Sequence, residues 1–176
     1  MEALRESHQV TVRWRSFELR PKGTPPLSEE YKASIAAKRH YFHQMAREHY
    51  GVEIHEGPFG VDSRPALVGA KFAEAQGVGD AYHEAVFRAY WQQAKSIEDV
   101  AVLTAVAEQV GLDKDAFVAA LADEVWETAV AADVHQAYQY GLHSVPALVF
   151  NNKYLVNGAQ PYDVLVQVVK QIREAA

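Results

Sequence analysis

The sequence predicts an α+β protein with a long helical lobe. Residues 9–14 alternate apolar and polar side chains, which is the period of a half-buried strand. Residues 28–140 have helical periodicity throughout. Residues 147–157 are expected to form two short strands around a tight turn, and a last helix follows them. A strand, a helical segment and a hairpin in this order are typical of a mixed fold.

The first part of the chain is predicted to contain a short helix and a strand. Residues 1–7 are expected to be the end of a helix. In the following segment Val10, Val12 and Trp14 are apolar, whereas the residues between them are polar, so we expect a strand over residues 9–14. Three prolines and a glycine within residues 21–26 then predict a loop.

The helical segment is punctuated by caps and glycines. Ser28 is expected to cap a helix whose first turn carries Glu29 and Glu30, and Gly51 to end it. Ser96-Ile97-Glu98-Asp99 is expected to act as a variant capping box. The other helices are expected over residues 63–75, 80–94, 96–110, 113–121 and 123–140.

The stretch from Gly141 to Leu165 is the one around which the fold is organised. Pro146 precedes an apolar strand at residues 147–150, a position where proline is compatible with a strand. Asn151-Asn152 predicts a two-residue turn, because asparagine tolerates positive φ, and a second strand follows at residues 153–157. Gly158 ends that strand, and Pro161 is expected in the first turn of the last helix.

Composition excludes several classes of function. A chain of 176 residues suits one domain with an insertion or two small lobes. The net charge of −6, without a long basic stretch, argues against a nucleic-acid partner. No apolar run approaches the ~20 residues of a membrane helix, and the N-terminus has no signal-peptide core. We therefore expect a cytoplasmic protein with no membrane partner, and the absence of cysteine fits a reducing compartment.

Three motifs resemble a known family: Ser-Val-Pro at 144–146, Tyr-Leu-Val-Asn-Gly-Ala-Gln at 154–160 and Trp-Arg-Ser-Phe-Glu-Leu at 14–19. They resemble the DsbA family, and within it the FrnE-type thiol–disulfide oxidoreductases, over nearly the whole chain. The resemblance implies an α/β, thioredoxin-like fold split by an all-helical insertion. The thioredoxin-like domain would comprise residues 1–27 and 141–176, and the helical domain residues 28–140. It also implies a cis peptide bond before Pro146.

The resemblance implies a Cys-x-x-Cys pair that this sequence does not contain. In the family this pair follows the first strand and opens a helix, and residues 1–4 align with the later part of that helix. We therefore expect the first strand and the cysteines to be missing, either from a shortened chain or from a relative without redox chemistry. No catalytic residue is expected in these 176 residues. The gap in the sheet would leave two unpaired strand edges and favour a homodimer or a larger assembly.

The substrate-facing surface is the expected site. By resemblance, the backbone of Val145 beside Pro146 would pair with an extended peptide or with a glutathione-like molecule, by β-strand addition. Ser144 and His143 flank that position, although a solvated loop histidine is the favoured reading for His143. Gln160 could reach the same groove or could simply precede a helix. The expected partners are thus a thiol or disulfide protein or a glutathione-like small molecule.

Metals and cofactors are not expected. His40 and His43 share a helix face and His49 follows, but a dedicated metal site needs three or four ligands and supporting hydrogen bonds. No acidic residue lies at the spacing of a known metal motif. Four aromatic residues are predicted to pack in the core of the helical lobe rather than hold a cofactor. They are Phe87, Tyr90, Trp91 and Tyr138.

Three functions stay open. The first is a DsbA-like, FrnE-type oxidoreductase that is redox-inactive in these residues, because thiol–disulfide exchange needs a thiolate. The second is a glutathione-using enzyme similar to hydroxychromene carboxylate isomerases or kappa-type glutathione transferases, which can use serine in place of the first cysteine. The third is a non-catalytic module that holds a peptide beside Pro146.

Overall fold

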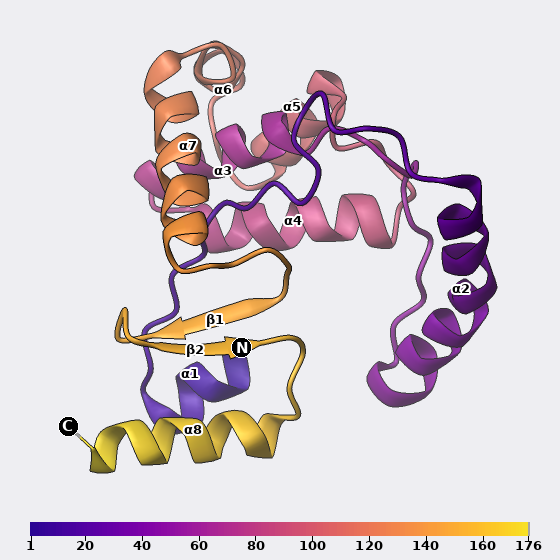
Figure 1. The fold of residues 1–176 in the computed structure, drawn as a ribbon. Helices are drawn as coiled ribbons and strands as arrows, with labels where there is room; N and C mark the ends of the chain where they lie inside the picture. Colours follow the sequence, from indigo (N-terminus) through magenta and orange to yellow (C-terminus); the bar gives the residue numbers. More distant parts are fainter. Residues whose placement is uncertain (176) are drawn as a thin grey trace. The chain divides into compact units, whose positions relative to one another are not determined.

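The computed structural model describes residues 1–175 and divides the chain into two compact units (Figure 1). Unit 1 comprises Met1–Leu19 and Asp133–Ala176, and unit 2 comprises Arg20–Ala132. The sequence had suggested boundaries after residues 27 and 140, eight residues later in each case. The second boundary falls inside helix α7 (Glu124–Gln139), so the first half of one helix belongs to unit 2 and the second half to unit 1.

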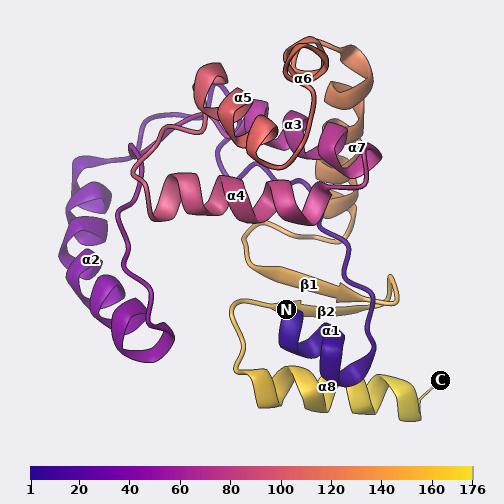
Figure 2. The ribbon, with the colours of Figure 1, turned by 180° about the vertical axis from the view of Figure 1, so that it is seen from behind.

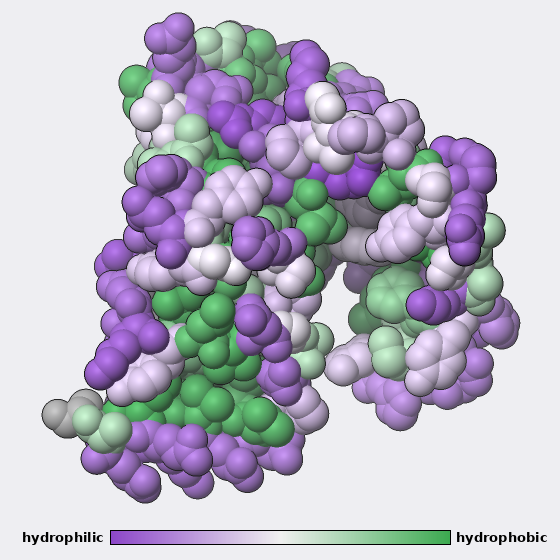
Figure 3. Space-filling model, viewed as in Figure 1, coloured by the Kyte–Doolittle hydropathy of each residue, from purple (hydrophilic) through white to green (hydrophobic). Residues whose placement is uncertain are grey.

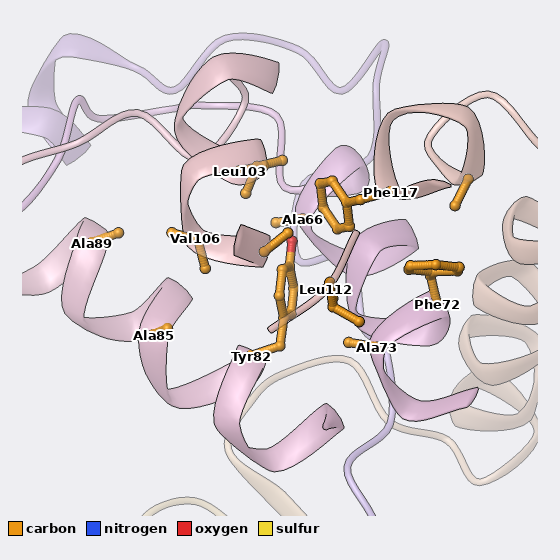
Figure 4. Close-up of a cluster of buried hydrophobic side chains, with 12 residues drawn as sticks. Ala66, Phe72, Ala73, Tyr82, Ala85, Ala89, Leu103, Val106, Leu112 and Phe117 are labelled. Atoms are coloured by element: carbon orange, nitrogen blue, oxygen red, sulfur yellow. The ribbon is translucent and has the colours of Figure 1, made fainter. Parts of the chain in front are cut away.

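Unit 2 is helical. Its elements are α2 (Glu29–Tyr50), α3 (Arg64–Ala75), α4 (Gly79–Trp91), α5 (Val100–Gln109), α6 (Lys114–Ala120) and the start of α7. Helices α3, α4, α5 and α6 pack around one apolar cluster, to which the aromatic rings of Phe72, Tyr82 and Phe117 contribute (Figure 4). This burial is the main stabilising contribution in the unit, because apolar area removed from water contributes roughly 25 cal/mol per Å².

Side-chain caps fix where several helices begin. The Ser28 hydroxyl accepts a hydrogen bond from the Tyr31 N–H at 3.2 Å, as expected from the sequence. The predicted capping box at residues 96–99 is wrong. Residues 96–99 form a turn, and Asp99 is the N-cap of α5, where its carboxylate accepts from the Ala101 N–H at 2.8 Å. Each cap satisfies a backbone donor that the helix itself leaves unpaired.

The prediction that four aromatic residues pack in the helical core is wrong for two of them. Phe87 is 53% exposed, and Tyr138 is 47% exposed and belongs to unit 1. Tyr90 and Trp91 are half-buried at the end of α4, with ring centroids 4.9 Å apart. The buried ring of α4 is instead Tyr82, which lies on a different face of the helix from Phe87.

Unit 1 contains α1 (Glu2–His8), the strands β1 (Ala147–Phe150) and β2 (Tyr154–Asn157), and α8 (Tyr162–Glu174). The strands pair antiparallel, with Leu148 opposite Val156. Both turn asparagines have positive φ, 50° for Asn151 and 54° for Asn152. Strand β2 begins at Tyr154, one residue later than predicted, and Pro161 is the N-cap of α8 rather than its first helical residue.

One face of the hairpin packs on α1 and α8, which lie side by side (Figure 2). Leu4 of α1 and Leu165 and Val169 of α8 are buried there. Leu148, Phe150 and Val156 pack against them from the hairpin, together with Val10 and Val166. An isolated two-stranded hairpin is marginally stable in water, so this cluster is what holds it.

The predicted strand at residues 9–14 is wrong. The segment contains no strand, and Gln9 has left-handed φ and ψ of 48° and 43° at the end of α1. Within residues 1–175 the sheet has two strands, so the segment has no strand partner. Its Val12 carbonyl instead accepts a hydrogen bond from Arg5 at 3.3 Å. Of the alternating apolar residues, Val10 packs on the α1–α8 cluster, whereas Trp14 is 41% exposed.

Candidate functional site

The loop between α7 and β1 places the predicted site residues. Gly141 ends α7 with a φ of 69°, a value that favours glycine. The Gly141 N–H donates to the Tyr138 carbonyl at 2.9 Å, and the Leu142 N–H to the Ala137 carbonyl at 3.0 Å. These bonds close the helix and turn the chain sharply toward β1. Residues 143–146 therefore lie in an exposed loop whose two ends are both fixed.

The Val145–Pro146 peptide bond is cis, which is the geometry implied by the sequence resemblance. The Pro146 carbonyl accepts a hydrogen bond from the Gly158 N–H at 2.8 Å, so it continues the β1–β2 ladder by one residue. Val145 is 52% exposed. Within residues 1–175 its backbone N–H and carbonyl form no hydrogen bond. Val145 thus presents a free donor and a free acceptor to solvent.

The other predicted residues divide into two groups. Ser144 and His143 directly precede Val145 in the chain, and all three residues are exposed. Gln160 lies two residues after Gly158, but its side-chain amide donates to the Asn157 carbonyl at 2.9 Å. In this structure Gln160 closes the turn after β2.

Two aromatic rings near the loop were not predicted as site residues. The Tyr138 ring lies 6.3 Å from the His143 ring and 6.2 Å from the Phe17 ring, centroid to centroid. Both distances fall in the range of weak aromatic contacts. Phe17 belongs to the Trp-Arg-Ser-Phe-Glu-Leu motif, so the motif itself was the signal that could have drawn attention to it.

A buried carboxylate fixes the segment that contains Phe17. Asp133 of α7 is 6% exposed, and it accepts hydrogen bonds from the Arg15 guanidinium at 2.9 Å and from the Ser16 N–H at 2.8 Å. Charge-assisted hydrogen bonds of this kind are stronger than neutral ones. Asp133 therefore holds residues 15–17 against the same helix that carries Tyr138.

A second group of charged residues lies in unit 2, around a hollow of about 350 Å³ between α2 and residues 53–56. Glu56 pairs with both Arg39 and His43, the latter at 2.6 Å, and Glu53 lies 3.9 Å from Arg47. The cations and carboxylates balance each other, so this hollow offers no excess charge to a ligand. Among the described residues no group of three or more His, Cys, Asp or Glu side chains could hold a metal ion.

Of the helices formed by residues 1–175, none combines the length and apolar character needed to cross a bilayer.

Comparison with known protein families identifies the family of this chain. A family model described as a DSBA-like thioredoxin domain matches residues 1–170, almost the whole chain. The chain belongs to the DSBA-like thioredoxin domain family. The predicted thioredoxin-like, DsbA-type fold is therefore confirmed, with mostly helical content and a small two-stranded sheet.

Individual proteins and solved structures are similar to this chain over most of its length. The chain is 30% identical over 165 residues to the uncharacterized protein YwbO of Bacillus subtilis (strain 168), covering 91% of this chain and 81% of YwbO. A probable DsbA oxidoreductase from Streptomyces coelicolor is 28% identical, with a TM-score of 0.73, covering 89% of this chain and 73% of that one. A 2-hydroxychromene-2-carboxylate isomerase is 19% identical, with a TM-score of 0.78, covering 99% and 85%. The last likeness shows the shared fold.

The chemistry available in this DSBA-like chain is limited by its side chains. The 176 residues contain no cysteine, so they hold no thiol that could become a thiolate nucleophile. Around Val145 the loop offers instead free backbone groups, the Ser144 hydroxyl and the imidazole of His143. Such groups bind and orient a ligand, and main-chain pairing is the interaction for which Val145 is best placed.

Proposed function

We propose that this chain is a DsbA-like protein of the FrnE type whose loop at residues 143–146 binds an extended substrate. The substrate class is a thiol or disulfide polypeptide, or a molecule with a glutathione-like backbone. The observation that carries the proposal is Val145, which is exposed directly before Pro146 and has its N–H and carbonyl both unpaired within residues 1–175. The match to a DSBA-like family model and the likeness to a probable DsbA oxidoreductase support it.

We further infer that the 176 residues have no thiol–disulfide exchange activity of their own. Exchange proceeds by attack of a thiolate on a disulfide, and no side chain of this sequence supplies one. An insulin-reduction assay with dithiothreitol should therefore run at the uncatalysed rate. Acceleration that scales with protein concentration would show that this inference is wrong, while leaving the binding proposal untouched.

The binding proposal is tested by NMR on backbone amides. Titration with an oxidised cystine-containing peptide should shift the amides of residues 143–147. In Val145→Glu the affinity should fall at least tenfold, because approach of the peptide backbone would desolvate the new carboxylate. Val125→Glu is the matched control, since Val125 is a similarly exposed valine of unit 2, and its affinity should be unchanged. Shifts confined to unit 2, or equal affinities of the two variants, would exclude this site.

The glutathione-using alternative is examined in the same titration. The chain shares its fold with a 2-hydroxychromene-2-carboxylate isomerase, and Ser144 presents an exposed hydroxyl beside the loop. Reduced glutathione at millimolar concentration should shift residues 143–146 if that alternative holds. Ser144→Ala should then weaken the binding of glutathione more than the binding of the peptide.

A further inference from the structure

We propose that Asn157 is a self-modification site, at which the chain converts an asparagine into aspartate or isoaspartate without an enzyme. The attacking group is the backbone nitrogen of Gly158, and the co-reactant is water. The hydrogen bond from the Gly158 N–H to the Pro146 carbonyl controls the reaction. This inference is independent of the proposed function, because it concerns a covalent change in the hairpin and not a ligand of the loop.

The chain has three asparagines, and all of them lie on the hairpin. They are Asn151, Asn152 and Asn157. The residue after an asparagine limits attack on the asparagine side chain, because its own side chain crowds the approach of its backbone nitrogen. Glycine has no Cβ, so Gly158 offers the least hindered nitrogen of the three. Asn151 and Asn152 precede residues with long side chains, Asn152 and Lys153, and should react more slowly.

The reaction forms one bond and breaks another, without oxidation or reduction. The Gly158 nitrogen attacks the side-chain carbonyl carbon of Asn157, and the new C–N bond closes a five-membered succinimide. The side-chain amide nitrogen leaves as ammonia, taking the proton of the Gly158 N–H. Water then opens the succinimide. Addition at the side-chain carbonyl gives aspartate, and addition at the main-chain carbonyl gives isoaspartate, in which the main chain passes through the former side chain.

The Asn157 side chain is accessible for this reaction. Asn157 is the last residue of β2 and is exposed, and its side-chain amide forms no hydrogen bond within residues 1–175. The Gln160 amide donates to the backbone carbonyl of Asn157 at 2.9 Å, a bond that holds the main chain and not the side chain. Water therefore reaches both the amide and the succinimide that replaces it.

The folded hairpin restrains the reaction at two points. The Gly158 N–H donates to the Pro146 carbonyl at 2.8 Å, so the proton that ring closure must remove is held in a hydrogen bond. Asn157 also lies in a strand, opposite Ala147, and strand residues have ψ near +135°. Closing the five-membered ring requires the Gly158 nitrogen to turn toward the Asn157 side chain, which an extended ψ does not allow. Separation of this end of β2 from Pro146 and Ala147 releases both restraints at once.

That separation needs only a local opening. The Pro146–Gly158 bond lies at the loop end of a ladder whose strands have four residues each. A two-stranded hairpin has little stability of its own, and the end of such a ladder opens at a lower free energy than a packed core. The rate in the folded protein is then the rate in the unfolded chain multiplied by the fraction of time that this end is open.

The modification changes the end of the hairpin that holds the loop. Strands β1 and β2 contain no charged residue, and Figure 3 shows hydrophobic residues gathered over the hairpin region beside α8. Either product adds a carboxylate to β2. Isoaspartate also lengthens the main chain by one carbon, so the Gly158 N–H no longer meets the Pro146 carbonyl in the same register. The loop at residues 143–146 then loses one of its two fixed ends.

The experiment follows two tryptic peptides by mass spectrometry while the folded protein is incubated in mildly alkaline buffer. Peptide 154–170 contains Asn157, and peptide 115–153 contains Asn151 and Asn152, which serve as internal controls. Peptide 154–170 should exchange an amide for a carboxylate at least tenfold faster than peptide 115–153. Its product should separate into an aspartate form and an isoaspartate form, because water opens the succinimide at either carbonyl.

Variants and unfolding test the control by the hairpin. Gln160→Ala removes the bond to the Asn157 carbonyl and should accelerate the reaction at least threefold. Gln167→Ala is the matched control, since Gln167 is an exposed residue of α8, and its rate should equal that of the unaltered chain. In guanidinium chloride the unaltered chain should react at least tenfold faster than when folded, and the effect of Gln160→Ala should disappear. Asn157→Gln should stop the reaction, because glutamine must close a six-membered ring.

Three results would overturn the inference. Equal rates for the two tryptic peptides would show that Asn157 is no more reactive than the turn asparagines. Aspartate without isoaspartate would exclude the succinimide and indicate direct hydrolysis of the amide. A rate that is the same in the folded and the unfolded chain would exclude control by the Pro146–Gly158 bond. Each of these results leaves ligand binding at residues 143–146 untouched, so the proposed function is tested separately by its own titration.

Discussion

Replacing Tyr82 by phenylalanine should raise the free energy of unfolding. The Tyr82 side chain is fully buried in the core of unit 2, and its hydroxyl has no hydrogen-bond partner within residues 1–175 (Figure 4). Burial also raises the pKa of this phenol well above its usual range. A buried polar group left unpaired costs about 1–3 kcal/mol. Removing it forfeits only dispersion contacts of about 0.1–0.2 kcal/mol for each atom pair.

The expected gain for Tyr82→Phe is therefore about 1–2 kcal/mol. Urea unfolding followed by tryptophan fluorescence and far-UV circular dichroism measures it, with the m-value used to check that the unfolded ensemble is unchanged. Tyr41→Phe is the control, since Tyr41 is 71% exposed and should change stability by less than ~0.5 kcal/mol. A loss of about 1 kcal/mol or more in Tyr82→Phe would refute the reasoning, because it would show that the hydroxyl has a stabilising partner.

Three further predictions concern other sites. A Cβ at Gly69 would lie 2.4 Å from the Tyr82 hydroxyl, so Gly69→Ala should cost about 1–3 kcal/mol, and the cost should be smaller in a Tyr82→Phe background as measured by a double-mutant cycle. Asp133→Ala should lower unfolding free energy by about 2–3 kcal/mol in urea, because the buried Ser16 N–H loses its acceptor, whereas Asp133→Asn should cost less. Burial lowers the pKa of His83 in the folded state, although the negative charges of Asp80 and Glu74 act in the opposite direction. The unfolded state therefore binds more protons than the folded state at acidic pH. As a result, the free energy of unfolding decreases as the pH falls from 6.5 toward the lowered pKa of His83. His83→Gln should therefore show a smaller drop in urea midpoint between pH 7.5 and pH 5 than the unaltered chain, and an equal drop would contradict the assignment.

The parts of the fold that sequence predicted well are those controlled by local chemistry. Ser28 caps α2 because a serine hydroxyl satisfies a free N–H of the first turn, which is a property of neighbouring residues. Asn151 and Asn152 form the hairpin turn for the same kind of reason, since asparagine tolerates positive φ. The loop at Val145–Pro146 was predicted from the Ser-Val-Pro motif at residues 144–146. The family resemblance of that motif implied the cis peptide bond before Pro146.

The parts that sequence predicted badly depend on partners distant in the chain. The alternation at residues 9–14 predicts which face is buried, but a strand also needs a paired neighbour, and within residues 1–175 none is present. Tyr138 was assigned to the helical core because its helix is continuous, whereas α7 passes from one unit to the other at Asp133. The motif at residues 14–19 drew attention to Phe17, but its contact with Tyr138 joins residues that no periodic pattern relates, so this pairing could not be predicted.

Helix α2 should open locally at a lower free energy than the rest of unit 2. Among the 22 residues of α2, Ala46 alone is buried. The helix contacts the rest of unit 2 through the Phe42–Trp91 ring pair and through ion pairs with Glu53 and Glu56. The Arg47–Glu53 pair is exposed, and exposed ion pairs contribute about 0–1 kcal/mol each and are screened by salt. Its amide protons should therefore exchange through a local transition of low free energy, and raising the ionic strength should speed that exchange. Limited proteolysis would accordingly cut within α2 first and leave the Tyr82 core as a protected fragment.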